Sequence, residues 1–268
     1  RSGYVQRRAR AGQIVVDAGL RAFAEGWSLP EGLVVVERMW GRPEPMAPLS
    51  PPQTLGPVGL ERLRAYIHPA LINRLGEEQM ALLGERRAVT AMFVAFKGID
   101  YGDHEAAELL RDYLDQVLTI VEHYGGFLSK VEVGDKGSTY LVLWGAPVAY
   151  ENDVERALHC ALELLALGEV AIQVGINTGF AFCGMVGSAE RQEYTVIGDT
   201  VNLAARLMVM ALPGQIIVGQ GMVTVAEQQF QLNRLPPRRV KGKRELVAAW
   251  ELVGLRRTSF RIQEPTYD

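Results

Sequence analysis

The sequence predicts an α+β fold: a ferredoxin-like βαββαβ core with an additional α/β extension. Two observations carry this prediction. Between residues 86 and 255, strand-like apolar runs and helical apolar repeats follow one another in the order β-α-β-β-α-β, and further α and β segments come after them. Glycines and other turn residues separate these segments at the spacing of short connections.

Each element follows from its own local pattern. The first run is continuously apolar and rich in β-branched residues, as in a buried strand. The helical pattern after it repeats apolar residues every three or four positions and stops at Gly125. A Gly-Asp-Lys-Gly turn predicts a hairpin. The expected elements are a strand at 88–96, a helix from Asp103 to Gly125, strands at 127–133 and 138–144, a helix from Asn152 or Asp153 to Leu167, strands at 170–177 and 179–184, a helix at 201–210 and a strand at 215–218.

Composition excludes several classes of protein. The 268 residues include 28 basic and 31 acidic side chains, so the basic surplus of a nucleic-acid-binding protein is absent. No apolar run approaches the roughly 20 residues of a membrane-spanning helix. Two cysteines, Cys160 and Cys183, are typical of a reducing compartment. Because the chain has no initiator Met, we expect a cytoplasmic piece of a longer protein.

The chain outside the main domain divides into four segments. Six of the thirteen prolines lie in 41–57, which predicts an extended linker. Residues 58–85 have helical spacing interrupted at Pro69 and form a helical lead-in to a domain at 86–255, and 256–268 is a C-terminal tail. Residues 11–16 (AGQIVV) repeat 213–218 (PGQIIV). Either these are unrelated strands that begin alike, or, as we favour, residues 1–40 are the tail of a preceding copy of the same domain.

The most informative segment is 193–208, EYTVIGDTVNLAARLM. On a helix, Asn202 and Arg206 lie one turn apart and face the same way. An amide beside a guanidinium suits a site where negative charge develops on phosphate oxygens. Spacing alone would favour an ordinary polar helix surface, and the identity of the whole segment reverses that preference.

This segment resembles the signature of the class III nucleotidyl cyclase catalytic domain. Further motifs occur in the expected order: GGFLSKVEVGD, WGAP, GINTG, CGMVG and VKGKREL. GDKGSTYLVLWGAP together with 193–208 is most similar to the second cyclase domain of soluble, bicarbonate-responsive adenylyl cyclases and their bacterial relatives. Those proteins carry two cyclase domains in tandem, which agrees with the repeat.

The resemblance implies that two domains form the active site between them. One supplies two aspartates that hold two Mg²⁺ or Mn²⁺ ions, and the other supplies an Asn and an Arg for the transition state. Asn202 matches the Asn that orients the ribose, and Arg206 matches the Arg that stabilises charge on the α-phosphate. At the first metal position this chain has Ala95, which cannot ligate a metal. Asp135 keeps a carboxylate at the second position, where it is also an ordinary turn residue.

Substrate-binding residues follow from the same resemblance. Lys130 and Thr195, with the backbone of Val196, occupy the positions that select adenine, and Lys241 or Lys243 would neutralise the triphosphate. Lys130 is also compatible with a strand-surface charge, and the two other lysines with a solvated turn.

The resulting expectation is an adenylate cyclase half-domain. It would convert ATP to 3′,5′-cAMP and pyrophosphate when paired with a complementary, metal-bearing cyclase domain. A catalytically inactive regulatory module that senses a nucleotide or bicarbonate, and a guanylate cyclase half, are the alternatives. Lys130 favours adenine over guanine, because guanine selection in the family usually places Glu there.

Overall fold

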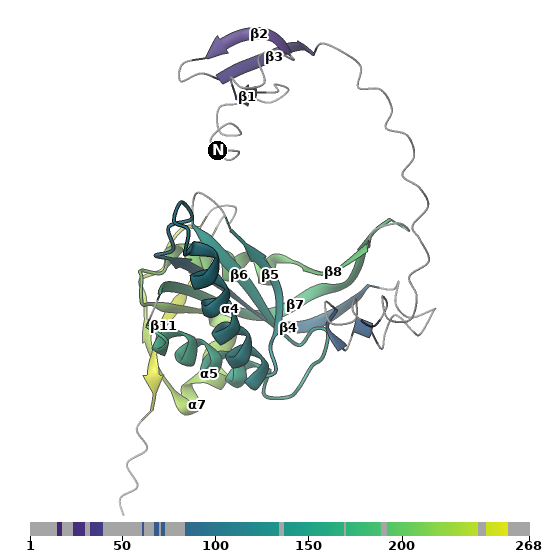
Figure 1. Ribbon diagram of the computed structural model, residues 1–268. Helices are drawn as coiled ribbons and strands as arrows, with labels where there is room; N and C mark the ends of the chain where they lie inside the picture. The colour runs from purple at the N-terminus through teal and green to yellow at the C-terminus, as the bar shows by residue number, and fades with distance from the viewer. Residues whose placement is uncertain are drawn as a thin grey trace, which may run out of the picture. The chain divides into compact units, whose positions relative to one another are not determined.

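The computed structural model describes residues 15–17, 24–29, 33–39, 61, 67–69, 71–72, 84–133, 137–168, 170–188, 192–240 and 245–256 (Figure 1). The chain divides into two units, residues 1–66 and 67–268. Among the described residues, no helix has both the length and the apolar character needed to cross a bilayer.

An eight-stranded mixed sheet forms the centre of the larger unit. Its strands are β4 (Glu85–Lys97), β5 (Phe127–Glu132), β6 (Ser138–Trp144), β7 (Ala171–Gly187), β8 (Gln192–Ile197), β9 (Ile216–Gly219), β10 (Phe230–Arg234) and β11 (Ala249–Leu255). The spatial order is β10-β11-β9-β7-β4-β6-β5, with β8 paired to the far part of β7. Each of the strands β7-β4-β6-β5 is antiparallel to its neighbour, and with their two helices these strands confirm the predicted ferredoxin-like core.

Helices cover both faces of this sheet, because β4 is apolar on both sides. Met92, Val94 and Phe96 point toward α4 (Ala106–His123) and α5 (Asp153–Ala166), and α7 (Val223–Gln229) completes that layer (Figure 1). Val89 and Ala91 alternate with them and pack under α6 (Asp199–Met210) on the other face. A short 3₁₀ turn, η3 (Gln220–Met222), precedes α7.

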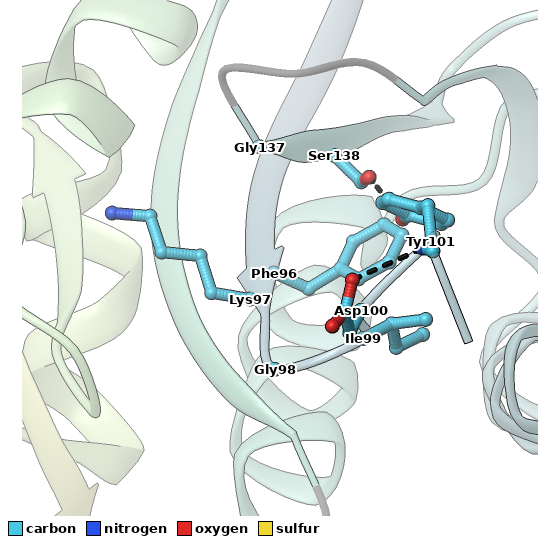
Figure 2. A pocket seen from close by; sticks show the side chains of 9 residues that line it. Phe96, Lys97, Gly98, Ile99, Asp100, Tyr101, Gly137 and Ser138 are labelled. Atoms are coloured by element: carbon cyan, nitrogen blue, oxygen red, sulfur yellow. Dashed lines mark hydrogen bonds between the residues drawn. The ribbon is translucent and has the colours of Figure 1, made fainter. Parts of the chain in front are cut away.

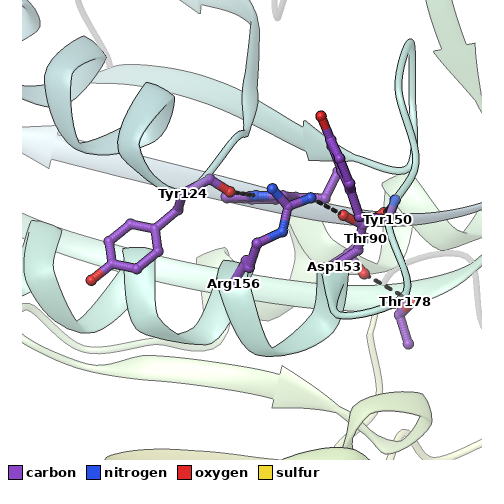
Figure 3. A network of polar contacts seen from close by, with 7 residues as sticks. Thr90, Tyr124, Tyr150, Asp153, Arg156 and Thr178 are labelled. Carbon is purple, nitrogen blue, oxygen red and sulfur yellow. Dashed lines mark hydrogen bonds and ion pairs between the residues drawn. The ribbon is translucent and has the colours of Figure 1, made fainter.

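Buried polar groups anchor the ends of the core elements. Trp144 Nε1 donates to the carbonyl of Tyr124 at 2.9 Å, which ties β6 to the end of α4. The guanidinium of Arg156 pairs with Asp153 and lies 4.3 Å from the ring centre of Tyr150 (Figure 3). These contacts hold the start of α5 against the loop that follows β6.

Two predicted boundaries are wrong. The predicted helix cap Asp103 lies before the helix: α4 has Glu105 as its N-cap, and Asp103 Oδ1 accepts the Glu105 N–H at 3.2 Å. The two strands predicted at 170–177 and 179–184 are one strand, β7, because β4 pairs with it continuously from Ala171 to Cys183. β8 was not expected, since its mixed polar and apolar pattern gives a weak strand signal.

The smaller unit contains a three-stranded antiparallel sheet of β1 (Val15–Asp17), β2 (Ala24–Leu29) and β3 (Leu33–Met39). Its order β1-β3-β2 is the order of β9-β11-β10 in the larger unit. Pairing also corresponds: Val35 faces Val15 and Trp27, as Glu251 faces Ile217 and Asn233. A register shift follows the first two residues of both β2 and β10. The backbone of β1–β3 thus repeats that of the last strands of the larger unit.

Candidate active site

The candidate site depends on α6, which lies directly against β7. A Cβ atom at Gly175 would collide with the backbone of Ala204 and Met208 and would lie 2.7 Å from the carbonyl carbon of Leu207. Only glycine therefore permits this approach. The buried Asn177 Nδ2 donates to the carbonyl of Thr200 at 3.1 Å and fixes the start of the helix.

Thr200 adds a second anchor at the same end of α6. Its hydroxyl donates to the carbonyl of Phe180 at 2.9 Å. Gly179 leaves room for it, because a Cβ there would lie 2.8 Å from Thr200 Oγ1. These contacts with β7 thereby fix the start of α6 and hold the helix close to the sheet.

With α6 held in this way, Asn202 and Arg206 share one outward face. Both line a cavity of about 580 Å³ between α6 and the segment that leads to residue 240. The lining residues are Asn202, Ala205, Arg206, Val209, Met210, Arg239 and Val240. The structure thus brings together the two residues that the sequence assigned to the transition state.

The guanidinium of Arg206 is only loosely compensated. Its side chain is 27% exposed, and its nearest carboxylate oxygen, Asp199 Oδ1, lies 3.9 Å from Nη1. Nη1 itself is buried, and no hydrogen-bond partner reaches it within the described part of the chain. A buried donor without a partner favours an incoming acceptor such as a phosphate oxygen.

Lys130 on β5 and Thr195 on β8 belong to a different part of the surface. Lys130 is 59% exposed, and Nζ donates to Glu132 Oε1 at 2.7 Å. This hydrogen bond and the charge of Glu132 raise the pKa of Lys130, and Glu193 on β8 adds to the effect. The half-buried Thr195 pairs with Gly184, while the Val196 side chain is buried in the core. None of the three lines the cavity at Asn202 and Arg206.

The expected metal position on β4 does not fit a metal ion. Ala95 pairs with Thr139 and Gln173 and offers only a methyl group. A separate cavity of about 450 Å³ lies at the end of β4, lined by residues 96–102 with Gly137 and Ser138 (Figure 2). There Asp100 Oδ1 accepts the Gly102 N–H at 3.0 Å, and the Tyr101 and Ser138 hydroxyls form a hydrogen bond. One oxygen of the Asp100 carboxylate is thus engaged by the backbone of its own turn.

Asp135, Lys241 and Lys243 lie outside the described residues. Two kinds of residue at the site were not assigned from the sequence. Gly175 and Asn177 were identified only as parts of the GINTG motif, because the sequence does not show that this segment lies against a helix. Arg239 precedes the basic turn, and nothing local distinguishes it from Arg238.

Comparison with known proteins defines the class. Residues 84–253 match the family described as adenylate and guanylate cyclase catalytic domain. The chain belongs to this family, and its larger unit is a nucleotidyl cyclase catalytic domain with the α+β fold of that family.

Two relatives with similar sequences are adenylate cyclases. The chain is 31% identical to human adenylate cyclase type 10 over 163 residues, which are 57% of this chain and 10% of that protein. It is 31% identical to adenylate cyclase 1 of Rhizobium meliloti over 190 residues, 63% of this chain and 28% of the relative. The chain therefore spans about a tenth and about a quarter of these two relatives.

Two solved structures share the fold. The adenylyl cyclase CyaB of P. aeruginosa has a TM-score of 0.61 and 25% identity, covering 66% of this chain and 98% of that one. The guanylyl cyclase Cya2 has a TM-score of 0.56 and 27% identity, covering 66% and 96%.

Proposed function

We propose that this domain is the metal-deficient, complementary half of an adenylate cyclase. Paired with a cyclase domain that bears both metal aspartates, it converts ATP to 3′,5′-cAMP and pyrophosphate for intracellular signalling. The observation that carries the proposal is the pairing of Asn202 and Arg206 at one cavity in a domain whose metal position is Ala95.

The residues of this chain would act on the reacting phosphate. As the ribose 3′-hydroxyl attacks the α-phosphorus and pyrophosphate leaves, charge changes on the phosphate oxygens. In this proposal Arg206 donates to these oxygens, and Asn202 orients the ribose. When bound by the partner domain, Mg²⁺ or Mn²⁺ would lower the pKa of the attacking hydroxyl and neutralise the phosphates.

Exposed apolar side chains support a protein partner. Phe180, Phe182 and Val186 share one face of β7, where Phe180 is 60% exposed, and Ile197 of β8 pairs with Phe182. Separately, Val209 of α6 is 75% exposed and lines the cavity itself. Large apolar side chains exposed together on one face are typical of an interface. We infer that the metal-bearing domain covers them.

The smaller unit supports a partner encoded just upstream. β1–β3 reproduce the order, pairing and register shift of β9, β11 and β10. We therefore infer that residues 1–40 are the end of a preceding cyclase domain, joined through 41–57 and 58–85 to this one. Because two cysteines, Cys160 and Cys183, are too few for a disulfide framework, we place the assembly in the cytoplasm.

The first prediction tests the half-site directly. We expect no cAMP from ATP with Mg²⁺ or Mn²⁺ when the chain is assayed alone, because Ala95 leaves the metals unbound. Adding back the upstream domain with its two metal aspartates should produce cAMP. Turnover by the chain alone would mean that another group holds the metals, and a preference for GTP in the pair would identify a guanylate cyclase.

A second prediction concerns the base. If Lys130 recognises adenine through a charge-assisted hydrogen bond, Lys130→Met should lower kcat/KM for ATP in the paired assembly roughly 10- to 100-fold. The ratio of ATP to GTP turnover should fall with it. Lys97→Met, which removes an exposed lysine from the end of β4, is the matched control. An equal ratio of ATP to GTP turnover in both variants would mean that Lys130 is an ordinary surface residue paired with Glu132.

A further inference from the structure

We propose that Arg239 is a second phosphate-binding residue of the site and that it holds the β- and γ-phosphates of ATP, the part that leaves as pyrophosphate. This inference rests on the proposed function and adds a residue to the same cavity. Arg239 and Arg206 are 33 positions apart in the sequence and line one cavity from two different segments.

The described lining of the cavity carries only positive charge. Its seven residues include two arginines and no carboxylate, and the Asp199 carboxylate outside the lining lies 3.9 Å from Arg206 Nη1. The rest of the lining is apolar apart from Asn202, so little in the wall itself compensates these cations. Guanidinium groups that converge on one space repel each other unless an anion lies between them. A ligand with several adjacent phosphates meets that requirement, since each guanidinium can bind a phosphate through two N–H groups.

Arg239 differs in its surroundings from the arginines that form salt bridges. Arg87, Arg111 and Arg156 each have a carboxylate within 3.3 Å. Over the described ranges, no carboxylate oxygen lies within 4 Å of the Arg239 guanidinium. Its charge is therefore available to a ligand.

The backbone on both sides of Arg239 is held in place. Arg238 forms a two-way backbone bridge with Val247, at 2.9 and 3.2 Å, and the Val240 side chain is buried beside the cavity. Arg239 thus extends from an anchored segment on the wall opposite α6. Since Arg206 is assigned to the α-phosphate, the guanidinium on the facing wall is positioned for the phosphates that follow it.

Arg238 provides a matched control. It has the same charge, is also exposed, and does not line the cavity. In the paired assembly, Arg239→Ala should raise the KM for ATP and the inhibition constant of pyrophosphate about tenfold each, the effect of losing one charged hydrogen bond. Inhibition by cAMP, which lacks these phosphates, should not change. Arg239→Lys should recover part of the loss, and Arg238→Ala should resemble wild type.

Binding of pyrophosphate to the chain itself separates this inference from the proposed function. Calorimetry should show that inorganic pyrophosphate binds the wild-type chain and the Arg238→Ala variant about tenfold more tightly than Arg239→Ala. This comparison holds even if the wild-type pair makes no cAMP, a result that would reject the proposed function alone. Equal pyrophosphate affinity in both variants, or none in wild type, overturns the role of Arg239. A loss of inhibition by cAMP that parallels the loss of inhibition by pyrophosphate in Arg239→Ala would also overturn it.

Discussion

Replacing Arg206 or Asn202 by Ala should lower the kcat of the paired cyclase about 10²–10³-fold, the effect of removing one preorganised donor to a developing charge. The KM for ATP should change little, because both groups act mainly in the transition state. The measurement is cAMP formation over a range of ATP concentrations, with each variant chain added to the same metal-bearing partner.

Two controls make this result specific. Arg111→Ala removes a guanidinium from the exposed surface of α4 and should not change kcat. Thermal unfolding should be close to wild type for both site variants, since Asn202 is exposed and Arg206 Nη1 has no hydrogen bond to lose among the residues that the structure describes. Unchanged cAMP output from Asn202→Ala would favour a regulatory module without turnover.

Gly175→Ala should damage both stability and activity without touching the substrate. The added methyl group would meet backbone atoms of α6, which cannot rotate away as a side chain would. Overpacking of this kind costs about 3 kcal/mol, at the upper end of its usual range, or about 6–12 °C in Tm for a domain of this size. Because α6 must shift to admit the methyl, kcat should also fall, roughly 100-fold for a displacement of about 1 Å.

Gly254→Ala is the matched control for this change. Gly254 lies in β11, and a Cβ there would meet nothing within 4 Å. Since Ala is favoured over Gly in a strand by about 0.5–1 kcal/mol, the control should be neutral or slightly more stable. Calorimetric Tm values and paired activity for the two variants decide the point. A Gly175→Ala chain with wild-type Tm would mean that α6 does not rest on β7 as described.

The core order was predictable because it follows from periodicity. Apolar residues at intervals of two or of three to four gave the helices and strands from β4 to β7, including both faces of β4. The division of β7 into two strands was wrong because Thr178 and Gly179 resemble a turn locally, while their pairing with β4 is decided 90 residues away in the chain.

The assignments of Asn202 and Arg206 came from a motif, and no periodicity argument would have selected them. Their common face on α6 was predictable from their spacing on a helix, and the shared cavity agrees with it. The separation of Lys130 and Thr195 from that cavity was not predictable, since it depends on how β5, at one edge of the sheet, and β8, paired with β7, lie relative to α6.

Local patterns along the chain were sufficient for the fold class, the cyclase signature, the absence of an aspartate at position 95 and the N-terminal repeat, because each is written in contiguous residues. Three features depended on long-range packing: the approach of α6 to Gly175, the corresponding register of β1–β3 and β9–β11, and the meeting of Arg206 and Arg239 at one cavity. Sequence neighbours determine propensity, whereas a cavity is formed by segments that only the packed sheet brings together.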